Sequence, residues 1–270
     1  MTARFRPVYG LPYFGSKLPA VGAIVQAARE VGTTLFVEPF LGSGVASLNA
    51  AHHLGVDWIG YDVDPRVIAL HDWLSTASEA EVVAVLDEHD ERLGPVERST
   101  KGKDSHVGYD VRHAGYAPGA EALLRLTGAP LLGTLHIHKM RRKPTRRWLP
   151  SLPAWRRGTA IHGSFERSAS FDVPGAFFLL DPPYLGTDSD YTKGHAAVAT
   201  FSAARFMAWL GRLRSPRLIT YGADAREVLP DLDWRPLYTR SSKPTLNGQR
   251  DASAEDEARE ELYAFLPGTW

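Results

Sequence analysis

Four consecutive residues, Asp181-Pro182-Pro183-Tyr184, combine an acid, a rigid turn and an aromatic ring. Each proline fixes its own φ and restricts the residue before it, so we expect the Asp181 carboxylate and the Pro182 carbonyl to keep one orientation. Proline has no N–H, so this turn offers hydrogen-bond acceptors. Two fixed acceptors beside an aromatic face suit a planar ligand that carries an NH2 group, such as a nucleobase with an exocyclic amine. The alternative is a strand that ends in a Pro-Pro turn for structural reasons.

An apolar run, Gly-Ala-Phe-Phe-Leu-Leu at 175–180, precedes this turn and is entered from Pro174. A short apolar run bounded by prolines is typical of a buried parallel strand. The carboxyl end of such a strand is where α/β proteins carry their chemistry. The strand would therefore deliver Asp181 to the functional edge of a sheet.

A glycine-containing turn follows another predicted strand near the start of the chain. Residues 33–38 form that strand, Phe40-Leu41-Gly42-Ser43-Gly44 the turn, and 46–54 a helix of small residues. The turn lacks the third glycine of G-x-G-x-x-G and the Gly-Lys-Ser/Thr of a P-loop. Its glycines let the backbone approach a ligand closely, and Glu38 at the strand end can accept from a ligand amine or hydroxyl.

Asp62 ends the next predicted strand, residues 57–61, and comes twenty residues after Gly42. An acid at about this distance, at the end of the second strand, binds a ribose diol in doubly wound folds. A helix over 65–74 is predicted next, with Asp64 as its N-cap. Core packing alone would leave the strand-end acids and the glycines of this stretch unexplained.

The composition is that of an ordinary globular protein, with 44% hydrophobic and 23% charged residues in a chain of 270. That length allows one large α/β domain or a domain with a sizeable insertion. The absence of cysteine excludes disulfides, thiolate nucleophiles and Cys-ligated zinc, and we expect no metal site. The first seven residues are not a signal peptide, and no apolar run has membrane-spanning length. We therefore expect a cytoplasmic protein without a membrane partner.

Charge is segregated although the net charge is zero. Residues 122–165 contain no Asp or Glu but nine basic side chains: Arg125, Lys139, Arg141, Arg142, Lys143, Arg146, Arg147, Arg156 and Arg157. This pattern predicts a local contact with a polyanion, and a solvated basic face is the alternative. Trp148 and Trp155 lie among these charges, which suits phosphate contact with some packing on a base or sugar.

The other patterns predict elements around these motifs. Residues 9–17 form an aromatic, glycine-containing loop that ends in Lys17, whose ammonium is either beside an anionic ligand or solvated in a surface turn. We predict helices over 18–31, 78–93 and 201–213, strands over 131–137, 218–222 and 261–265, a loop over 99–119, and a hairpin or loop at Asn247-Gly248.

Four motifs together resemble one family. Phe-Gly-Ser-Lys at 14–17, Phe-Val-Glu-Pro-Phe-Leu-Gly-Ser-Gly at 36–44, Tyr-Asp-Val-Asp-Pro at 61–65 and Asp-Pro-Pro-Tyr at 181–184 are similar, in order and spacing, to the Dam-like DNA adenine methyltransferases. These enzymes use S-adenosylmethionine and carry a target-recognition insertion between the cofactor motifs and the catalytic motif. The resemblance covers 9–75 and 160–225, which is about half of the chain.

The resemblance implies a Rossmann-like α/β methyltransferase fold with a mainly parallel mixed sheet. It implies a catalytic domain over 1–75 and 160–270 and an inserted target-recognition, DNA-binding region over 76–159. It assigns catalysis to Asp181, Pro182, Pro183 and Tyr184, cofactor binding to Tyr13, Lys17, Glu38, Phe40, Gly42, Gly44, Asp62 and Phe165, and DNA binding to Lys139, Arg141, Arg142, Lys143, Arg146 and Arg147.

In this scheme Glu38 holds the methionine end of S-adenosylmethionine, Asp62 the ribose and Phe165 the adenine. Tyr184 stacks on a flipped adenine in double-stranded DNA, and residues 185–194 close over it. The sequence departs from the family where Ser164 replaces the usual acid before Phe165, and the usual recognition sequence is not found. A monomer or weak dimer is expected, and a partner restriction enzyme is compatible with the motifs but not implied.

Other activities fit parts of the pattern. Transfer to the cytosine N4 amine or to an RNA adenine would use the same turn, although Asp181 favours adenine over cytosine. A catalytically silent nucleotide- or DNA-binding protein would use the same fold, but the intact acids and glycines argue against it. A nicotinamide oxidoreductase is disfavoured by the missing third glycine.

Overall fold

The structure is a computed structural model that describes residues 7, 11, 17–97, 105–129, 135, 137–183, 201–222, 224–242, 245–246, 249–250 and 257–270. Several predictions from the sequence lie outside these residues. They concern Tyr13, Tyr184, the loop over 185–194, the turn at 247–248 and most of the strand over 131–137.

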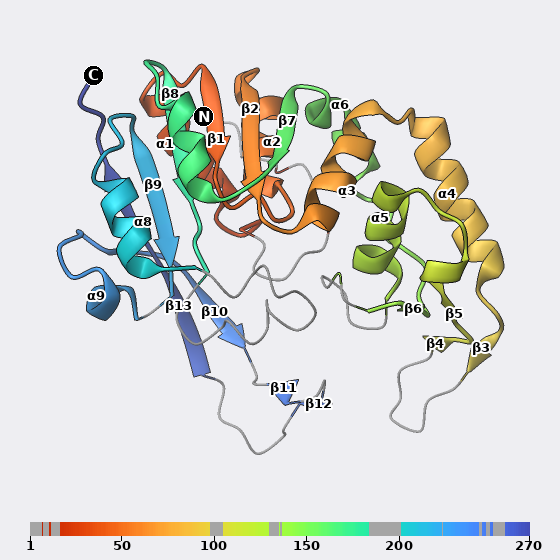
Figure 1. The fold of residues 1–270 in the computed structure, drawn as a ribbon. Helices are drawn as coiled ribbons and strands as arrows, with labels where there is room; N and C mark the ends of the chain where they lie inside the picture. Colours follow the sequence, from red (N-terminus) through yellow and green to blue (C-terminus); the bar gives the residue numbers. More distant parts are fainter. Residues whose placement is uncertain are drawn as a thin grey trace, which may run out of the picture.

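A seven-stranded sheet organises the chain in the order β10-β13-β9-β8-β1-β2-β7 (Figure 1). Parallel pairing joins β7 (Gly158–His162), β2 (Asp57–Asp62), β1 (Leu35–Glu38), β8 (Ala176–Leu180) and β9 (Arg217–Tyr221). β13 (Glu257–Leu266) runs antiparallel between β9 and β10 (Arg235–Ser242). The predicted fold class, a Rossmann-like α/β fold with a mainly parallel mixed sheet, is confirmed.

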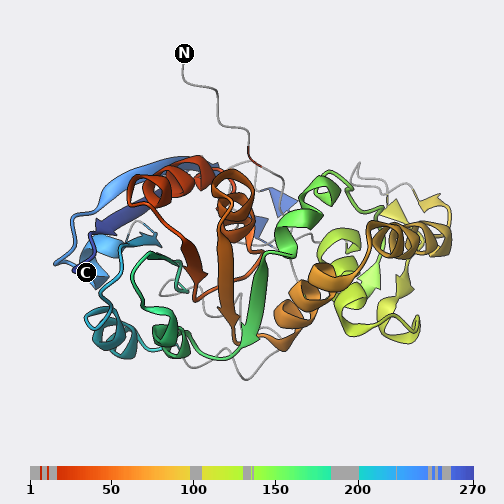
Figure 2. The same ribbon diagram turned by 90° about the horizontal axis from the view of Figure 1, so that it is seen from above.

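Helices cover both faces of this sheet (Figure 2). On one face pack α1 (Val21–Glu30), α2 (Val45–Leu54) and α3 (Pro65–Thr76), over a core that includes Phe36 and Phe177. On the other face pack α8 (Ala203–Leu210) and the 3-10 helix η3 (Phe165–Phe171), over a core that includes Val37 and Phe178. Side chains of β1 and β8 enter the two cores alternately, because successive side chains of a strand point to opposite faces.

Helix starts follow the capping residues in the sequence. Asp64 accepts from the backbone N–H of Arg66 at 2.9 Å and caps α3, as predicted. Ser78 and Glu81 form a capping box at the start of α4 (Glu79–Arg92), which confirms the acidic helix predicted over 78–93. The predicted helices over 18–31 and 201–213 are confirmed as α1 and α8.

The region between α3 and β7 is mainly helical and lies beyond the β7 edge of the sheet (Figure 2). It contains α4, the short strands β3 (Val96–Glu97), β4 (Ser105–His106), β5 (Tyr109–Asp110) and β6 (Lys139–Met140), the 3-10 helices η1 (Val111–His113) and η2 (Leu149–Ser151), and the helices α5 (Pro118–Gly128) and α6 (Leu152–Trp155). Its buried side chains join those of α2 and α3 in one continuous core. The recognition role predicted for 76–159 stays a prediction.

The remaining elements lie near β9, β10 and β13. They are α9 (Ala225–Val228) and the two-stranded ribbon of β11 (Thr245–Leu246) and β12 (Gln249–Arg250). Among the described residues, no helix has the length and apolar character to cross a bilayer.

Candidate functional site

The direction of chain winding reverses between β1 and β8, which are neighbours in the sheet. From β1 the chain winds through α2 to β2, and from β8 it winds through α8 to β9 on the opposite face. Ligands of open α/β sheets bind outside the carboxyl ends of the strands at such a switch point. The structure places Glu38, Asp62 and Asp181 at the carboxyl ends of β1, β2 and β8, so the three predicted acids lie along one edge.

Glu38 is buried beneath the start of α2. Its Oε2 accepts from the Ser47 backbone N–H at 3.2 Å and from the Ser47 hydroxyl. Burial removes the carboxylate from water and raises its pKa to about 8, although the bonds from Ser47 oppose the rise. Asp181 raises the same pKa by repulsion and Lys17 lowers it by attraction. Glu38 therefore belongs to the same electrostatic cluster as the residues after β8.

The glycine turn after β1 is held by Asp62. Gly42 and Gly44 have φ of 47° and 63°, left-handed values that favour glycine. Asp62 accepts from the backbone N–H of Gly42 through Oδ2 at 3.0 Å and from that of Asp64 through Oδ1 at 2.9 Å. Burial raises the pKa of Asp62 to about 6. One carboxylate thus fixes the turn while it stands at the end of β2.

Asp181 is held by residues from two other parts of the chain. Its Oδ2 lies 3.0 Å from Nζ of Lys17, and its Oδ1 accepts from the Thr220 hydroxyl of β9 at 2.9 Å. The Lys17 ammonium is also 3.7 Å from Oε2 of Glu261 on β13 and is only 5% exposed. The orientation of Asp181 predicted from the prolines is thus supported by side chains that the sequence analysis did not assign to it.

An aromatic cluster lies beside the glycine turn. The rings of Phe40 and Phe165 stack with centroids 5.3 Å apart, and Phe201, Phe206 and Trp209 surround them. Phe165, predicted to pack on the cofactor adenine, is 8% exposed within this cluster, and Phe40 is partly exposed. Phe40 is therefore the more exposed of the two stacked rings, and Phe165 packs behind it.

Ser164, which replaces the family's usual acid, precedes Phe165 and is the N-cap of η3. The nearest carboxylate in the chain is Glu166, which forms an ion pair with Arg205 of α8. Hydrogen bonding to Ser164 and the Arg205 charge lower the pKa of Glu166 against the opposing effect of its burial. An acid is therefore present two residues after Ser164 in a fixed, charged form.

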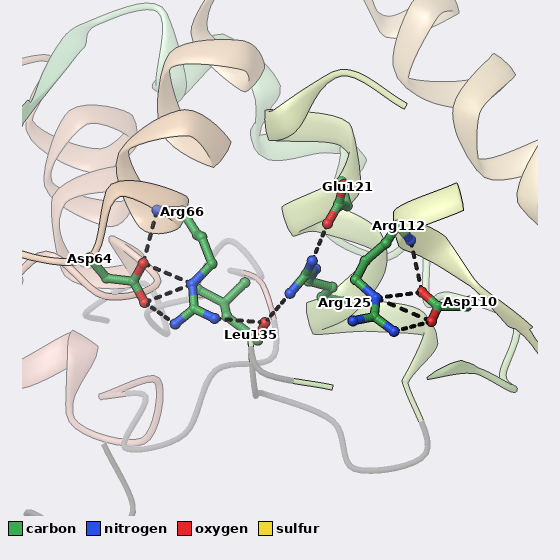
Figure 3. Close-up of polar contacts among 7 residues, drawn as sticks. All are labelled: Asp64, Arg66, Asp110, Arg112, Glu121, Arg125 and Leu135. Carbon is green, nitrogen blue, oxygen red and sulfur yellow. Dashed lines mark hydrogen bonds and ion pairs between the residues drawn. The ribbon is translucent and has the colours of Figure 1, made fainter. Parts of the chain in front are cut away.

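Two arginines join the start of α3 to the region beyond it (Figure 3). Arg66 holds both Asp64 oxygens and donates through Nη1 to the Leu135 carbonyl at 3.0 Å. Arg125 of α5 donates to the same carbonyl at 2.9 Å and pairs with Glu121. The backbone N–H of Asp64 also donates to Asp62, so these bonds connect the acid at the end of β2 to α5. Farther along, Arg112 forms a separate two-pronged pair with Asp110.

The six predicted DNA-binding residues differ in their surroundings. Lys139, Lys143 and Arg147 are exposed, and Arg141 and Arg142 are partly exposed. Arg146 instead forms ion pairs of 2.7 and 2.9 Å with Asp87 and Asp90 of α4. Its charge is therefore offset within the chain.

The interpretation of the two tryptophans as packing surfaces for a base or sugar is wrong. Trp148 and Trp155 are 1% and 0% exposed, and their rings meet edge to face with centroids 6.1 Å apart. They belong to the core shared by α3 and α6, because an apolar ring gains more from burial than from solvent contact beside basic side chains. The basic residues that flank both tryptophans in the sequence suggested a solvent-facing position, which is why their burial was not predicted.

Sequence reasoning missed Ser47, Thr220 and Glu261 as neighbours of the strand-end acids. Ser47 lies in the first turn of α2, where backbone N–H groups lack helical partners, so its bond to an acid at the preceding strand end follows from position. Thr220 and Glu261 lie on strands that the sequence predicted as 218–222 and 261–265. Their proximity to Asp181 depends on strand order, which the local pattern does not contain.

No protein-family model matches the sequence, and no curated protein matches it. Among solved structures, the rRNA methyltransferase aviRa from Streptomyces viridochromogenes aligns with 97% of this chain and 88% of its own, at 16% identity and a TM-score of 0.40. A methyltransferase from Geobacter sulfurreducens aligns over 95% of this chain and 81% of its own, at 12% identity and a TM-score of 0.36. Similarities this low carry no argument about activity. The fold class rests on the strand order and directions described above.

Proposed function

We propose that this chain is an S-adenosylmethionine-dependent DNA methyltransferase that modifies the exocyclic N6 amine of an adenine flipped out of the duplex. The observation that carries the proposal is the meeting of β1 and β8 at the switch point, with Glu38 ending one strand and Asp181 following the other. Glu38, proposed to hold the cofactor, and Asp181, proposed to accept from the target amine, therefore lie at the ends of neighbouring strands.

The residues at the ends of β1 and β2 fit the chemistry of the cofactor. Glu38 offers a carboxyl group to the amino-acid end, and Asp62 offers one to the ribose, while Gly42 and Gly44 allow close approach of the backbone. Phe40, which is partly exposed, would offer its ring to the adenine, and Phe165 would support it from behind. Bound S-adenosylmethionine would supply the methyl group from its sulfonium centre.

Asp181 would act on the target amine as a fixed acceptor. The lone pair of the adenine amine is delocalised into the ring, so the amine is a poor nucleophile. N–H bonds to the Asp181 carboxylate and the Pro182 carbonyl would localise that lone pair and stabilise the positive charge that develops on nitrogen. Each carboxylate oxygen has two acceptor directions, so Asp181 can accept from the target while Lys17 and Thr220 keep their contacts.

Lys17 and Thr220 would preorganise this acceptor. The Lys17 ammonium holds Oδ2 at 3.0 Å, and the Thr220 hydroxyl fixes the rotation of the carboxylate through Oδ1. Tyr184 would stack on the flipped base. The chain contributes orientation and electrostatics, and it forms no covalent intermediate with the base.

Double-stranded DNA is proposed to lie across the edge of the sheet from which Asp181 projects. The strands β3 to β6 lie on the side toward which the arrows of β9 and β10 point (Figure 1). Lys139 begins β6, and Lys143 and Arg147 follow within the same segment, all three of them exposed. Exposed cations on the same side of the sheet as the turn that starts at Asp181, here called the acceptor turn, suit contacts to phosphates.

The experiment that tests the proposal is transfer of a tritiated methyl group from S-adenosylmethionine to duplex DNA, followed by nucleoside analysis. N6-methyl-2′-deoxyadenosine is the expected product. Label in N4-methylcytosine, or in adenosine when RNA replaces DNA, would overturn the proposed target and identify another amine. No label in any nucleic acid would overturn the activity, and retained DNA binding would then indicate a silent reader.

A variant locates the chemistry within the chain. Asp181→Ala is expected to abolish detectable transfer while it keeps cofactor binding and a cooperative unfolding transition. Transfer at the wild-type rate by folded Asp181→Ala would show that Asp181 does not act on the amine. Asp57→Ala is the matched control, because Asp57 begins β2 at the opposite edge of the sheet and is exposed.

A further inference from the structure

A buried histidine, His71, forms a hydrogen bond to the glycine turn after β1. His71 lies on α3 and is 1% exposed. Its Nε2 is 2.9 Å from the carbonyl oxygen of Gly42, and its Nδ1 accepts from the indole N–H of Trp155 at 3.0 Å. Both ring nitrogens are therefore engaged, one by the turn after β1 and the other by α6.

These contacts define the proton on the imidazole. The indole nitrogen of Trp155 can only donate, so Nδ1 of His71 must carry a lone pair. The proton of the neutral ring is then on Nε2, which donates to Gly42. Burial lowers the pKa of His71 to about 4, so the ring is neutral at ordinary pH. A protonated ring would place a second N–H against the indole donor.

The turn is held from two sides at Gly42. Its N–H donates to Asp62, and its carbonyl accepts from His71. His71 also packs beneath Gly44, where an added Cβ would lie 2.7 Å from Cε1 of the imidazole. A side chain at position 44 would therefore clash with the imidazole, so this packing requires glycine there.

We infer that His71 is a positioning residue for the cofactor turn and that Trp155, by fixing its tautomer, makes cofactor affinity depend on α6. The inference rests on the proposed function, in which Gly42 and Gly44 approach the cofactor. His71 does not touch the ligand. It sets the height and orientation of the Gly42 peptide, whose N–H also orients the acid proposed to hold the ribose.

His89 is a matched control within the same chain. It is also a buried histidine on a helix, with Nδ1 2.6 Å from the Tyr109 hydroxyl and Nε2 2.9 Å from the Arg142 carbonyl. It packs against Gly128 as His71 packs against Gly44. Both rings fill a tight space and bond to a carbonyl, but His89 contacts α5, Tyr109 of β5 and Arg142 after β6, and neither of these two ring bonds reaches the glycine turn.

The test compares His71→Leu, His71→Gln, Trp155→Phe and His89→Leu in the full chain. Calorimetry measures the Kd for S-adenosylhomocysteine, and hydrogen exchange measures the protection of the Gly42 and Gly44 amides. His71→Leu leaves the Gly42 carbonyl without its donor, and we expect a Kd about tenfold higher with faster exchange at both amides. His71→Gln can present an N–H again and should recover most of the affinity. His89→Leu should lower the unfolding temperature without changing the Kd or the exchange at the turn.

Trp155→Phe tests the tautomer step, because it keeps a buried ring but removes the indole donor. We expect a smaller rise in Kd than for His71→Leu and a mixed tautomer in the nitrogen chemical shifts of His71. At saturating cofactor kcat should change little, so the effect should appear in the KM for the cofactor.

Three results would overturn the inference. They are a wild-type His71 that carries its proton on Nδ1, an equal loss of affinity in His71→Leu and His89→Leu, and unchanged exchange at Gly42 in His71→Leu. If the wild-type chain binds no S-adenosylhomocysteine, the proposed function fails, and the exchange and tautomer measurements still decide the role of His71. If His71→Leu does not fold, Trp155→Phe and the wild-type spectrum decide it.

Discussion

Charged side chains at the carboxyl ends of the strands have different surroundings from those in the basic segment over 139–157. At the strand ends, Glu38, Asp62 and Asp181 face one edge of the sheet, and backbone or side-chain donors from other elements hold each of them. In the basic segment, Arg146 pairs with α4, and Arg157 donates to carbonyls at the start of β2, while Lys143 and Arg147 are exposed.

The difference comes from what fixes each side chain. An acid at the end of a parallel strand is placed by the sheet, which allows one position and one direction. A long basic side chain in an irregular segment finds whichever acid or carbonyl is within reach. An acid at a strand end can therefore be assigned to a site from the sequence. A count of basic residues does not say which of them are paired within the chain.

The largest expected effect concerns the tryptophans within the basic segment. Trp148→Ala removes a fully buried ring, so we expect the free energy of unfolding to fall by about 4 kcal/mol in urea denaturation. Trp270→Ala, which removes a half-exposed ring, should cost much less. If Trp148→Ala kept its stability and lost only DNA binding, Trp148 would belong to the nucleic-acid surface and the contrast between the regions would disappear.

A cation at the site should be worth more to stability than a cation in the basic segment. Lys17→Met leaves Asp181 and Glu261 without their shared, buried ammonium, and we expect a loss of about 3 kcal/mol. Arg146→Met breaks partly exposed pairs with α4 and should cost about 1 kcal/mol or less. Equal losses in chemical denaturation would mean that burial does not distinguish the two charges.

The raised pKa of Glu38 predicts a pH-dependent affinity for the cofactor. The pKa rises from 4.5 to about 8 in the folded chain, so the carboxyl is protonated at pH 6, and the free energy of unfolding falls as pH rises through this window. A ligand ammonium favours the ionised form, so the Kd should fall by up to about tenfold per pH unit toward pH 8.

Calorimetry in buffers of different ionisation enthalpy should detect a proton released on cofactor binding near pH 7. Glu38→Gln should bind weakly at every pH and release no proton. A wild-type Kd that is constant between pH 6 and 8 would contradict the contact between Glu38 and a cationic group of the ligand.

The smallest expected effect separates exposed from paired cations in DNA binding. Lys143→Ala and Arg147→Ala should each weaken binding about fivefold near physiological salt and reduce the slope of log K against log salt by about 0.9. Arg146→Ala should leave that slope unchanged, because its guanidinium is held by Asp87 and Asp90. A reduced slope in Arg146→Ala would show that DNA displaces α4 from this arginine.

Much of the fold was predictable because its signals are local. Proline-bounded apolar runs predicted β8, Asp64 predicted the start of α3, and a serine followed by Glu81 marked α4. Glycines after β1 predicted the turn, and the structure shows that Gly42 and Gly44 are left-handed. In each case neighbouring residues in sequence determine the backbone.

The predictions failed or fell short where partners are distant in sequence. The structure has α5 at Pro118–Gly128, where the sequence analysis proposed only a loop up to residue 119 and no helix. Its local signals, Pro118 in the first turn and the Ala- and Leu-rich run after it, do favour a helix, and packing on α3 accounts for its apolar face. The strand β10 was missed because Pro236 lies near its start and residues 239–242 are all polar, so neither an apolar run nor an alternation marks it. Lys17 and Thr220, the partners of Asp181, were missed because they come from separate segments that only the sheet brings together. The same holds for Glu261, which shares Lys17 with Asp181.

The position of β13 has a consequence for the order in which the molecule assembles. This strand lies between β9 and β10 and carries Glu261, whose carboxylate shares Lys17 with Asp181. A contact between residues 17 and 261 closes a loop that contains nearly all of the sheet, so it forms late in folding. During synthesis on a ribosome, β1, β2, β7, β8 and β9 leave the exit tunnel before β13. The acceptor turn therefore gains its complete set of charged neighbours only after this strand has been made and has paired.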